Sequence, residues 1–418
     1  MVRQVTNIVG WQVWRKRIEE LNSLAASNPL WPEFILERHS LEVTFGRVRD
    51  HIRITGGRCA WPPKTVDEYR LYSFIAMVAP VYEKLGLKGK KRLAGAIRSG
   101  LKEEYGLGPI AFEMKTATHL MSRGFDVDFQ DLENDGGYDF FAVSGETKFE
   151  VECKHASADI GRKLHRRKLY NLAGLLSPVL SRYLEVNQGG IHLRVNLPGR
   201  LNGKIELHQQ LTSEIQMALS SGNGAESKSC TISVEKFDIA TSPFSHNRET
   251  DLTPSDIREK FCRDRGCEAG HSLATWRSGE AAIVVSFNSC KEDTVLSNIL
   301  KNLKEDSKRQ FSGQHPAFMC VYLADISDEQ LLNIAKTDQS GTATGIKFTL
   351  NKLLRDRPHI HTVALISEGA VYNQRNRLGN SRTTSSQEIA PSYFFRNPDH
   401  PQTNNPILQS VFTPRESS

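Results

Sequence analysis

Apolar residues recur at helical spacing in two stretches near the start of the chain, residues 14–25 ("WRKRIEELNSLA") and 66–86 ("VDEYRLYSFIAMVAPVYEKLG"). Between them, residues 40–63 alternate apolar and polar positions and then reach Gly and Pro stop signals. This alternation predicts a short hairpin. Residues 1–108 are therefore expected to form a mainly helical N-terminal region.

After residue 108 the pattern changes to helix, three strands, helix and strand. Two of the strands, "YDFFAV" and "KFEVECK", are separated by the turn sequence "SGET". A further helix and strand complete a predicted domain over residues 109–240. The expected elements are the helices 110–124, 161–186 and 203–219 and the strands 125–131, 138–143, 148–154, 190–197 and 230–239.

The C-terminal region, residues 241–418, again alternates strands with helices, which predicts an α/β layer. Its tail, from Arg375 onward, is rich in Asn, Ser, Thr and Pro and is expected to be loop-like. The expected strands are 281–287, 317–325 and 361–367, and the expected helices are 293–311, 328–336 and 347–356.

Composition narrows the class of protein. The 418 residues are 39% hydrophobic and 24% charged, which excludes a disordered chain. The seven cysteines are scattered and odd in number, so they favour a reducing compartment over a disulfide framework. We find no signal-peptide core and no apolar run of membrane-spanning length. The sequence predicts a soluble, cytoplasmic protein that does not bind a membrane.

The hairpin "GGYDFFAVSGETKFEVECKH", residues 136–155, carries the candidate chemistry. On its second strand, Glu150, Glu152 and Lys154 share one face, whereas the apolar residues between them share the other. In an antiparallel pairing, Asp139 lies opposite the end of that strand and joins the polar face. Two carboxylates at one strand end repel each other unless a cation lies between them, and oxygen ligands suit Mg²⁺ or Mn²⁺.

This arrangement resembles the PD-(D/E)xK phosphodiesterase superfamily, also called restriction-endonuclease-like, over residues 108–200. The resemblance implies an αβββαβ core in which Asp139 and Glu152 bind the divalent metal and the backbone carbonyl of Cys153 adds a ligand. It also implies a catalytic role for Lys154 and an auxiliary carboxylate at Glu113 on the first helix, which is included among the metal ligands. Tyr138 stands where many members have Pro.

Positive charge follows the motif directly and suggests contact with a nucleic-acid backbone, because Arg and Lys at the start of a helix commonly bind phosphates. A solvated helix face explains each of these side chains about as well. A second basic run, 88–98, allows the same two interpretations. The predicted nucleic-acid-binding residues are Arg162, Lys163, Arg166, Arg167 and Lys168.

The function that these features predict is a divalent-metal-dependent nuclease, with DNA as the favoured substrate and restriction, repair or anti-phage defence as its setting. Metal activates water for direct attack on phosphorus, so no covalent enzyme intermediate is needed. The alternatives are a non-catalytic nucleic-acid-binding or assembly protein that retains a nuclease-like scaffold, and an interaction protein whose hairpin binds no ligand. The sequence leaves open DNA against RNA, and whether the chain acts alone, as a homo-oligomer or with a partner protein.

The segment "CRDRGCEAGH" places Cys262, Cys267 and His271 close together in the sequence. Three such residues can bind zinc, but no fourth ligand lies nearby in the sequence. We interpret this segment as a loop with free thiols.

Overall fold

The structure is a computed structural model of the whole chain. It describes residues 1–57, 63–157, 159, 161–245, 252–324, 326, 329, 331, 346–367, 389 and 393–413. The chain divides into two compact units, each built from segments that are distant in the sequence. Unit 1 combines Met1–Leu21, Arg38–Ala158 and Leu296–Ser418, and unit 2 combines Asn22–Glu37 and Asp159–Val295. These units do not follow the three consecutive ranges expected from the sequence.

The N-terminal region is helical, as its periodicity predicts. The prediction of a hairpin from residue 40 is wrong, because Ser40–Ile54 form one helix. Residues 58–62 of the same stretch lie outside the described residues. Packing explains the difference: Phe45 is fully buried and its ring stacks on Trp14, with 4.2 Å between centroids. The helices are α1 (Val2–Val9), α2 (Trp11–Ser27), α3 (Glu33–Arg38), α4 (Ser40–Ile54), α5 (Val66–Lys84) and α6 (Leu87–Gly100).

Unit 1 contains a six-stranded mixed sheet in the order β1-β2-β3-β9-β10-β11. The first three strands are antiparallel neighbours, β3, β9 and β10 run parallel, and β11 pairs antiparallel with β10. Central parallel strands are covered on both faces, which explains the continuous apolar runs of β9 and β10. The strands are β1 (Asp126–Phe129), β2 (Phe140–Ser144), β3 (Thr147–Ser157), β9 (Ala317–Ala324), β10 (Ile360–Ile366) and β11 (Tyr393–Arg396).

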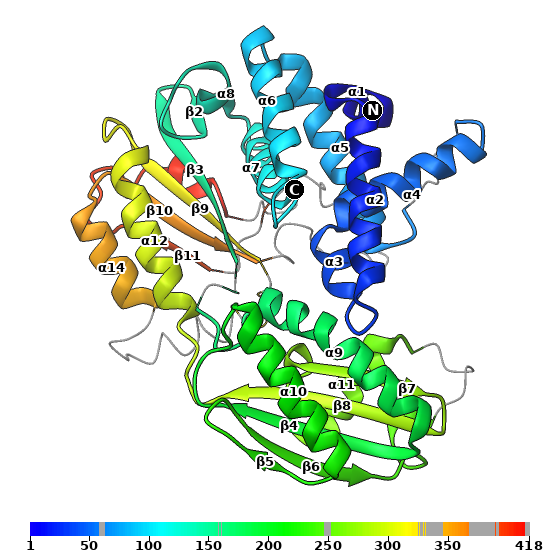
Figure 1. Cartoon of the computed structure of the whole chain (residues 1–418). Coiled ribbons are helices and arrows are strands. Elements are labelled where there is room, and N and C mark those ends of the chain that lie inside the picture. Colours follow the sequence, from blue (N-terminus) through cyan, green and yellow to red (C-terminus); the bar gives the residue numbers. More distant parts are fainter. Residues whose placement is uncertain are drawn as a thin grey trace. The chain divides into compact units, whose positions relative to one another are not determined.

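Helices lie on both faces of this sheet (Figure 1). On one face, α7 (Gly108–Ser122) packs its apolar side against Phe149, Val151 and Phe318 in the core of unit 1. On the other face lie α12 (Val295–Gln310) and α14 (Ile346–Asp356). A four-residue helix, α8 (Gln130–Glu133), follows β1.

The connection after β3 differs from the one that the sequence predicts. The helix and strand expected next in the core, 161–186 and 190–197, belong to unit 2. In unit 1, the helix that follows β3 is α12, and the parallel neighbour of β3 is β9, with Glu152 opposite Met319. Unit 1 thus has the element order α7-β1-β2-β3-α12-β9, with the unit 2 segment Asp159–Val295 between β3 and the body of α12.

Unit 2 contains a five-stranded mixed sheet in the order β5-β6-β4-β8-β7. The C-terminal strands expected to form one layer are therefore divided, since β8 pairs parallel with β4 in unit 2, whereas β9 and β10 lie in unit 1. Its strands are β4 (Gly189–Leu197), β5 (Ala225–Glu226), β6 (Thr231–Phe237), β7 (Ser272–Arg277) and β8 (Ala281–Ser289), and its further helices are α9 (Arg166–Val186), α10 (Ile205–Ser221) and α11 (Pro254–Arg265), with 3-10 turns at Pro243–Ser245 and Ala269–His271.

The described part of the C-terminal tail is more ordered than its composition predicts. It supplies the edge strand β11 and a short helix, α16 (Pro406–Ser410). Residues 368–388 and nearly all of the helix expected at 328–336 lie outside the described residues. Within the part of the chain that the structure describes, no helix combines the length and the apolar character needed to cross a bilayer.

Candidate functional site

The hairpin of β2 and β3 brings Asp139 to the Glu152-Cys153-Lys154 segment. Phe140 pairs with Val151 across the hairpin, and Asp139 directly precedes β2, so it continues this register toward Glu152. Its Oδ2 accepts a 2.6 Å hydrogen bond from the backbone N–H of Cys153. The hairpin register thus produces a direct contact between the first carboxylate of the motif and its second strand.

Alternation along β3 separates two sets of side chains. Phe149, Val151 and Cys153 are buried in the core of unit 1, as the sequence predicts. The opposite set is not a solvated polar face, because Glu150 and Glu152 are also buried. β3 lies in the middle of the sheet, and residues from outside the hairpin, such as Ser312 against Glu150, cover positions that an isolated hairpin would expose.

The two buried glutamates of β3 have different partners. Glu150 accepts hydrogen bonds from the backbone N–H of Ser312, at 2.9 Å, and from the Ser312 hydroxyl. Glu152 instead forms an ion pair through Oε1 with the Lys154 ammonium, at 2.7 Å. Its Oε2 is buried and, among the described residues, has no hydrogen-bond partner. Both carboxylate oxygens of Glu150 therefore accept hydrogen bonds from Ser312, whereas Oε2 of Glu152 remains available to accept one from a ligand.

Glu113 comes to the same place from α7. Burial, followed by the negative charges of Asp131 and Glu152, raises the pKa of Glu113 to about 8, and the Lys154 ammonium opposes this shift. Burial and the charges of Glu152 and Glu113 likewise raise the pKa of Asp139 well above its usual value, against the effect of the Cys153 N–H. Glu113, Asp139 and Glu152 therefore interact electrostatically, beside Lys154.

Glu152 has a raised pKa as well. Burial is the main cause, and the Lys154 ammonium offsets part of it. Carboxylates that share a poorly solvated site repel each other, so their ionised forms are disfavoured until positive charge arrives. Lys154 supplies one such charge, and the site can accept more.

Asp131 is a fourth carboxyl of this group that the sequence reasoning missed. Burial raises its pKa to about 6, and its charge acts on Glu113, Asp139 and Glu152. The signal was present in the sequence, since β1 and β2 are antiparallel neighbours, with Phe129 opposite Phe140. A residue shortly after β1 must then lie near a residue just before β2.

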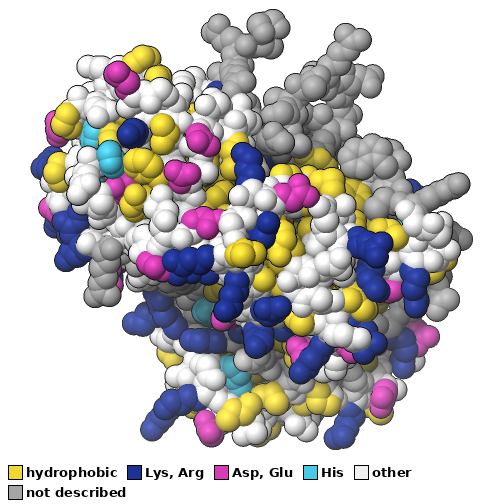
Figure 2. Space-filling model, turned by 90° about the horizontal axis from the view of Figure 1, so that it is seen from above, with side chains coloured by type: hydrophobic (Ala, Val, Ile, Leu, Met, Phe, Trp, Pro, Cys, Tyr) yellow, Lys and Arg dark blue, Asp and Glu magenta, His cyan; other side chains and the backbone are white. Residues whose placement is uncertain are grey.

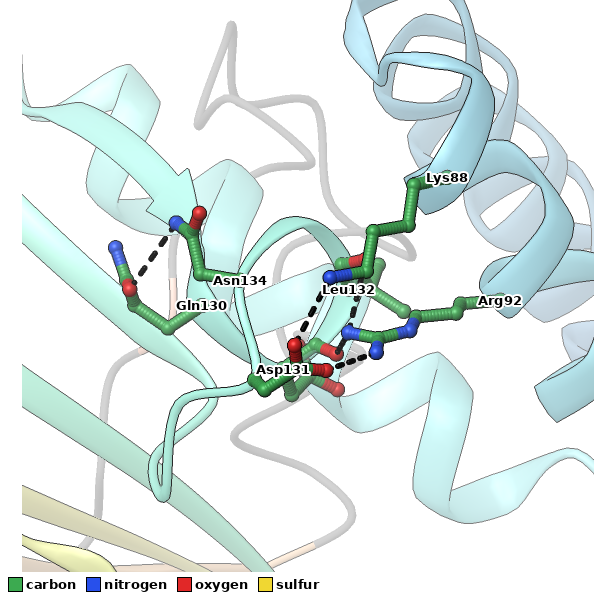
Figure 3. Close-up of polar contacts among 7 residues, drawn as sticks. Lys88, Arg92, Gln130, Asp131, Leu132 and Asn134 are labelled. Atoms are coloured by element: carbon green, nitrogen blue, oxygen red, sulfur yellow. Dashed lines mark hydrogen bonds and ion pairs between the residues drawn. The ribbon is translucent and has the colours of Figure 1, made fainter.

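The short helix α8, which carries Asp131, is bound with the residues after it to the basic helix α6 (Figure 3). Arg92 donates a 2.9 Å hydrogen bond to the backbone carbonyl of Asp131 and forms an ion pair with Asp135. Lys88 lies 3.0 Å from the same Asp135 carboxylate. Two of the basic residues of this run are thus engaged within unit 1, which accounts for them without a nucleic acid.

A close approach of backbone to side chain completes this attachment. The Gly86 N–H, at the start of α6, donates a 2.5 Å hydrogen bond to Oε1 of Glu133. A Cβ atom at Gly89 would lie 2.6 Å from that oxygen and 3.0 Å from a methyl carbon of Leu85. A side chain at residue 89 would therefore displace the end of the Glu133 side chain from the helix terminus.

The donor set fits a divalent cation in one specific respect. Across the described residues, no group of three or more His, Cys, Asp or Glu side chains is arranged to hold a metal ion. The ligand set implied by the resemblance contains three such side chains, Asp139, Glu152 and Glu113, beside the Cys153 carbonyl, so the structure does not arrange these three as a metal-binding group. The unpartnered Oε2 of Glu152 fits this set, because a buried acceptor without a donor is costly and a cation would satisfy it.

The five basic residues predicted to bind nucleic acid lie in unit 2, whereas Glu113, Asp139, Glu152 and Lys154 lie in unit 1. Several of the five have partners inside unit 2. Lys163 lies 3.1 Å from the Asn288 amide oxygen, and Lys168 donates to the Leu201 carbonyl at 3.2 Å. The Arg166 guanidinium lies over the Trp31 ring, 5.6 Å from its centroid.

These contacts give the basic segment a structural role within unit 2. Lys and Arg side chains also recur across the face of the molecule in Figure 2, with Asp and Glu side chains between them. Charge by itself therefore does not single out one binding surface on that face. Among the described residues, the stronger indication of function is the carboxylate group around Asp139.

Comparison with known proteins identifies no matching family model, no similar curated protein and no similar solved structure.

Proposed function

We propose that this protein is a divalent-metal-dependent nuclease that hydrolyses phosphodiester bonds at the site formed by Glu113, Asp139, Glu152 and Lys154. The observation that carries the proposal is the hydrogen bond from the Cys153 N–H to Asp139, at 2.6 Å. It joins the separated parts of the motif. The order α7-β1-β2-β3-α12-β9 supports a restriction-endonuclease-like αβββαβ core interrupted by unit 2.

Asp139, Glu152 and the Cys153 carbonyl would hold Mg²⁺ or Mn²⁺, and Glu113 would be an auxiliary ligand. When bound, such an ion polarises the phosphodiester and lowers the pKa of water. The group of carboxyls with raised pKa values around this position favours added positive charge, which supports the assignment.

Lys154 has the chemistry to orient a water molecule or to stabilise negative charge that develops on phosphate oxygens. Its ammonium is 2.7 Å from Oε1 of Glu152, and its side chain is 22% exposed. Glu152 thereby holds the Lys154 ammonium in one position beside the carboxyls of the site. This pairing accounts for the need of the motif to keep Glu and Lys on the same face of one strand.

DNA is the favoured substrate, and the chemistry suits restriction, repair or anti-phage defence. The proposal is tested by incubating the purified chain with plasmid DNA and with RNA in Mg²⁺ or Mn²⁺, and by adding EDTA. We expect metal-dependent cleavage that Lys154→Ala reduces by about 100-fold or more. Lys148→Ala is the matched control, because Lys148 is exposed and lies on the same face of the same strand.

Full activity of Lys154→Ala would assign the cleavage to another site. A scaffold without catalysis gives a different result, namely nucleic-acid binding that survives Glu152→Ala and no cleavage in any divalent metal. That candidate has one observation in its favour, since no group of three metal-binding side chains is present among the described residues. The same assay separates the two functions.

A further inference from the structure

The end of α11 in unit 2 brings two thiols together. Thr253 and Asp256 form a capping box at the start of this helix, and Gly266 ends it in the left-handed conformation, with φ 64°. This reversal lets the Cys267 N–H donate a 2.9 Å hydrogen bond to the Cys262 carbonyl. A backbone hydrogen bond between two residues holds their Cα atoms at about the 4.4–6.8 Å separation that disulfides span.

Polar side chains of the second sheet lie beneath these thiols. The Nε2 atom of His192, on β4, is 2.8 Å from the Ser286 hydroxyl on β8, which is 2.9 Å from the Ser272 hydroxyl on β7. Cys267 interacts with His192 and Ser286, and Cys262 interacts with Ser272. The surrounding cluster is otherwise largely apolar, so these few polar groups act on the sulfur atoms with little competition from water.

The two thiols are not equivalent. Cys262 is 1% exposed, whereas Cys267 is partly exposed, so an oxidant reaches Cys267 first. Hydrogen bonds from Cys262, His192 and Ser286 lower the pKa of Cys267 to about 4, and the bond to Cys267 together with burial raises the pKa of Cys262. A thiolate reacts with peroxides far faster than a thiol does.

The geometry points to a reversible disulfide between Cys262 and Cys267, with Cys267 as the sulfur that a hydroperoxide attacks first. The Cys267 thiolate attacks an oxygen of the hydroperoxide, the O–O bond breaks, and Cys267 becomes a sulfenic acid. The departing alkoxide or hydroxide takes up a proton from water and leaves as an alcohol or as water. Cys262 then attacks the sulfenic sulfur, the S–S bond forms and water leaves. Two thiols are oxidised by two electrons, and one hydroperoxide is reduced.

A metal site is not favoured at this position. No group of three or more metal-binding side chains occurs among the described residues. His271, the third zinc candidate of this segment, has its Nδ1 atom 2.8 Å from Oε2 of Glu268. The proposed modification site is therefore a thiol pair, and it is independent of the proposed nuclease activity.

Peptide mapping of the full-length protein tests this inference. The reduced chain is treated with hydrogen peroxide, free thiols are blocked with N-ethylmaleimide, and a non-reducing digest is analysed by mass spectrometry. We expect a Cys262–Cys267 cross-link that dithiothreitol reverses. Cys262→Ser should leave Cys267 as a sulfenic acid that dimedone traps, and Cys267→Ser should leave Cys262 reduced. Cys290→Ser is the control, because Cys290 is an exposed thiol outside this pair.

A second measurement needs no variant. The rate of iodoacetamide alkylation at Cys267 should change by less than about 3-fold between pH 6 and pH 8, whereas an unperturbed cysteine peptide changes by about 75-fold over this range, from a pKa of about 8.5. The inference is overturned if peroxide produces no Cys262–Cys267 cross-link in the wild type. A Cys267 alkylation rate that follows the reference peptide would remove Cys267 as the reactive thiol.

Discussion

The Asp139 carboxylate accepts a hydrogen bond from the Cys153 backbone N–H at 2.6 Å. This contact joins the residue before β2 to the middle of the Glu152-Cys153-Lys154 segment. It also fixes the direction of the Asp139 side chain, because one of its two oxygens is committed to the strand. The other oxygen is the one that a cation would use.

Replacing Asp139 with Asn should separate stability from metal binding. The Asn side-chain oxygen can still accept from the Cys153 N–H, and the variant loses a buried negative charge that Glu152 and Glu113 repel. In EDTA, we expect the variant to be as stable as the wild type or more stable. The Mn²⁺-induced rise in melting temperature and the cleavage activity should both be lost. Asp128→Asn, at an exposed position of β1, is the matched control.

Glu150→Gln and Glu152→Gln should have opposite effects, although both residues are buried on one strand. Glu150 accepts hydrogen bonds from Ser312, so Glu150→Gln should lower the free energy of unfolding by about 1–3 kcal/mol. The stabilisation of the protein by added Mn²⁺ should remain in this variant. Glu152→Gln should change the stability in EDTA little and abolish the stabilisation by added Mn²⁺. Chemical denaturation with and without Mn²⁺ measures both, and equal responses of the two variants would contradict the distinction.

Metal-free stability should fall as pH rises from 5 to 8. Glu113 and Asp131 have folded-state pKa values of about 8 and about 6, above their unfolded values, so the folded state holds their protons more tightly. Their contribution is complete below the unfolded pKa values and is lost as pH rises through the folded ones, by at most about 1.4 kcal/mol per pH unit for each group. Glu113→Gln should remove the part of the decline between pH 6 and pH 8, as measured by urea denaturation in EDTA.

Arg92→Ala should loosen the segment of residues 130–135, which contains Asp131. Arg92 binds the Asp131 carbonyl and the Asp135 carboxylate, so its loss should lower the stability of the protein and speed amide hydrogen exchange at residues 130–135. Lys91→Ala is the control on the same helix, at an exposed position. If both variants exchange this segment at the wild-type rate, the α6 contacts do not hold it.

Two glycines of α6 should respond differently to replacement by alanine. Gly95 is open to solvent, with no atom within 4 Å of an added Cβ, so Gly95→Ala should stabilise the helix by about 0.5–1 kcal/mol. At Gly89, the added Cβ would meet the Glu133 carboxylate at 2.6 Å and break its hydrogen bond to Gly86. Gly89→Ala should therefore stabilise the protein less than Gly95→Ala does, and equal stabilisation by both substitutions would argue against the Glu133 contact.

The sequence by itself determined the local geometry around the motif. The two-residue period of β3 assigns Phe149, Val151 and Cys153 to the core and Glu152 and Lys154 to the same opposite side, and the short turn sets Asp139 near them. These relationships depend on neighbours within about 20 residues of each other. Side-chain alternation and antiparallel pairing are enough to predict them.

Only the tertiary structure decided which distant elements complete the site. Parallel pairing of β3 with β9 joins residues separated by the unit 2 segment Asp159–Val295, and nothing local distinguishes β9 from β4 as the partner. Glu150 is buried on β3 and accepts a hydrogen bond from Ser312, a unit 1 residue that follows the unit 2 segment in the sequence. The approach of Asp131 and its attachment to α6 through Arg92 also depend on packing between elements. Local periodicity specifies which side of a strand a residue occupies, whereas long-range packing specifies what lies against that side.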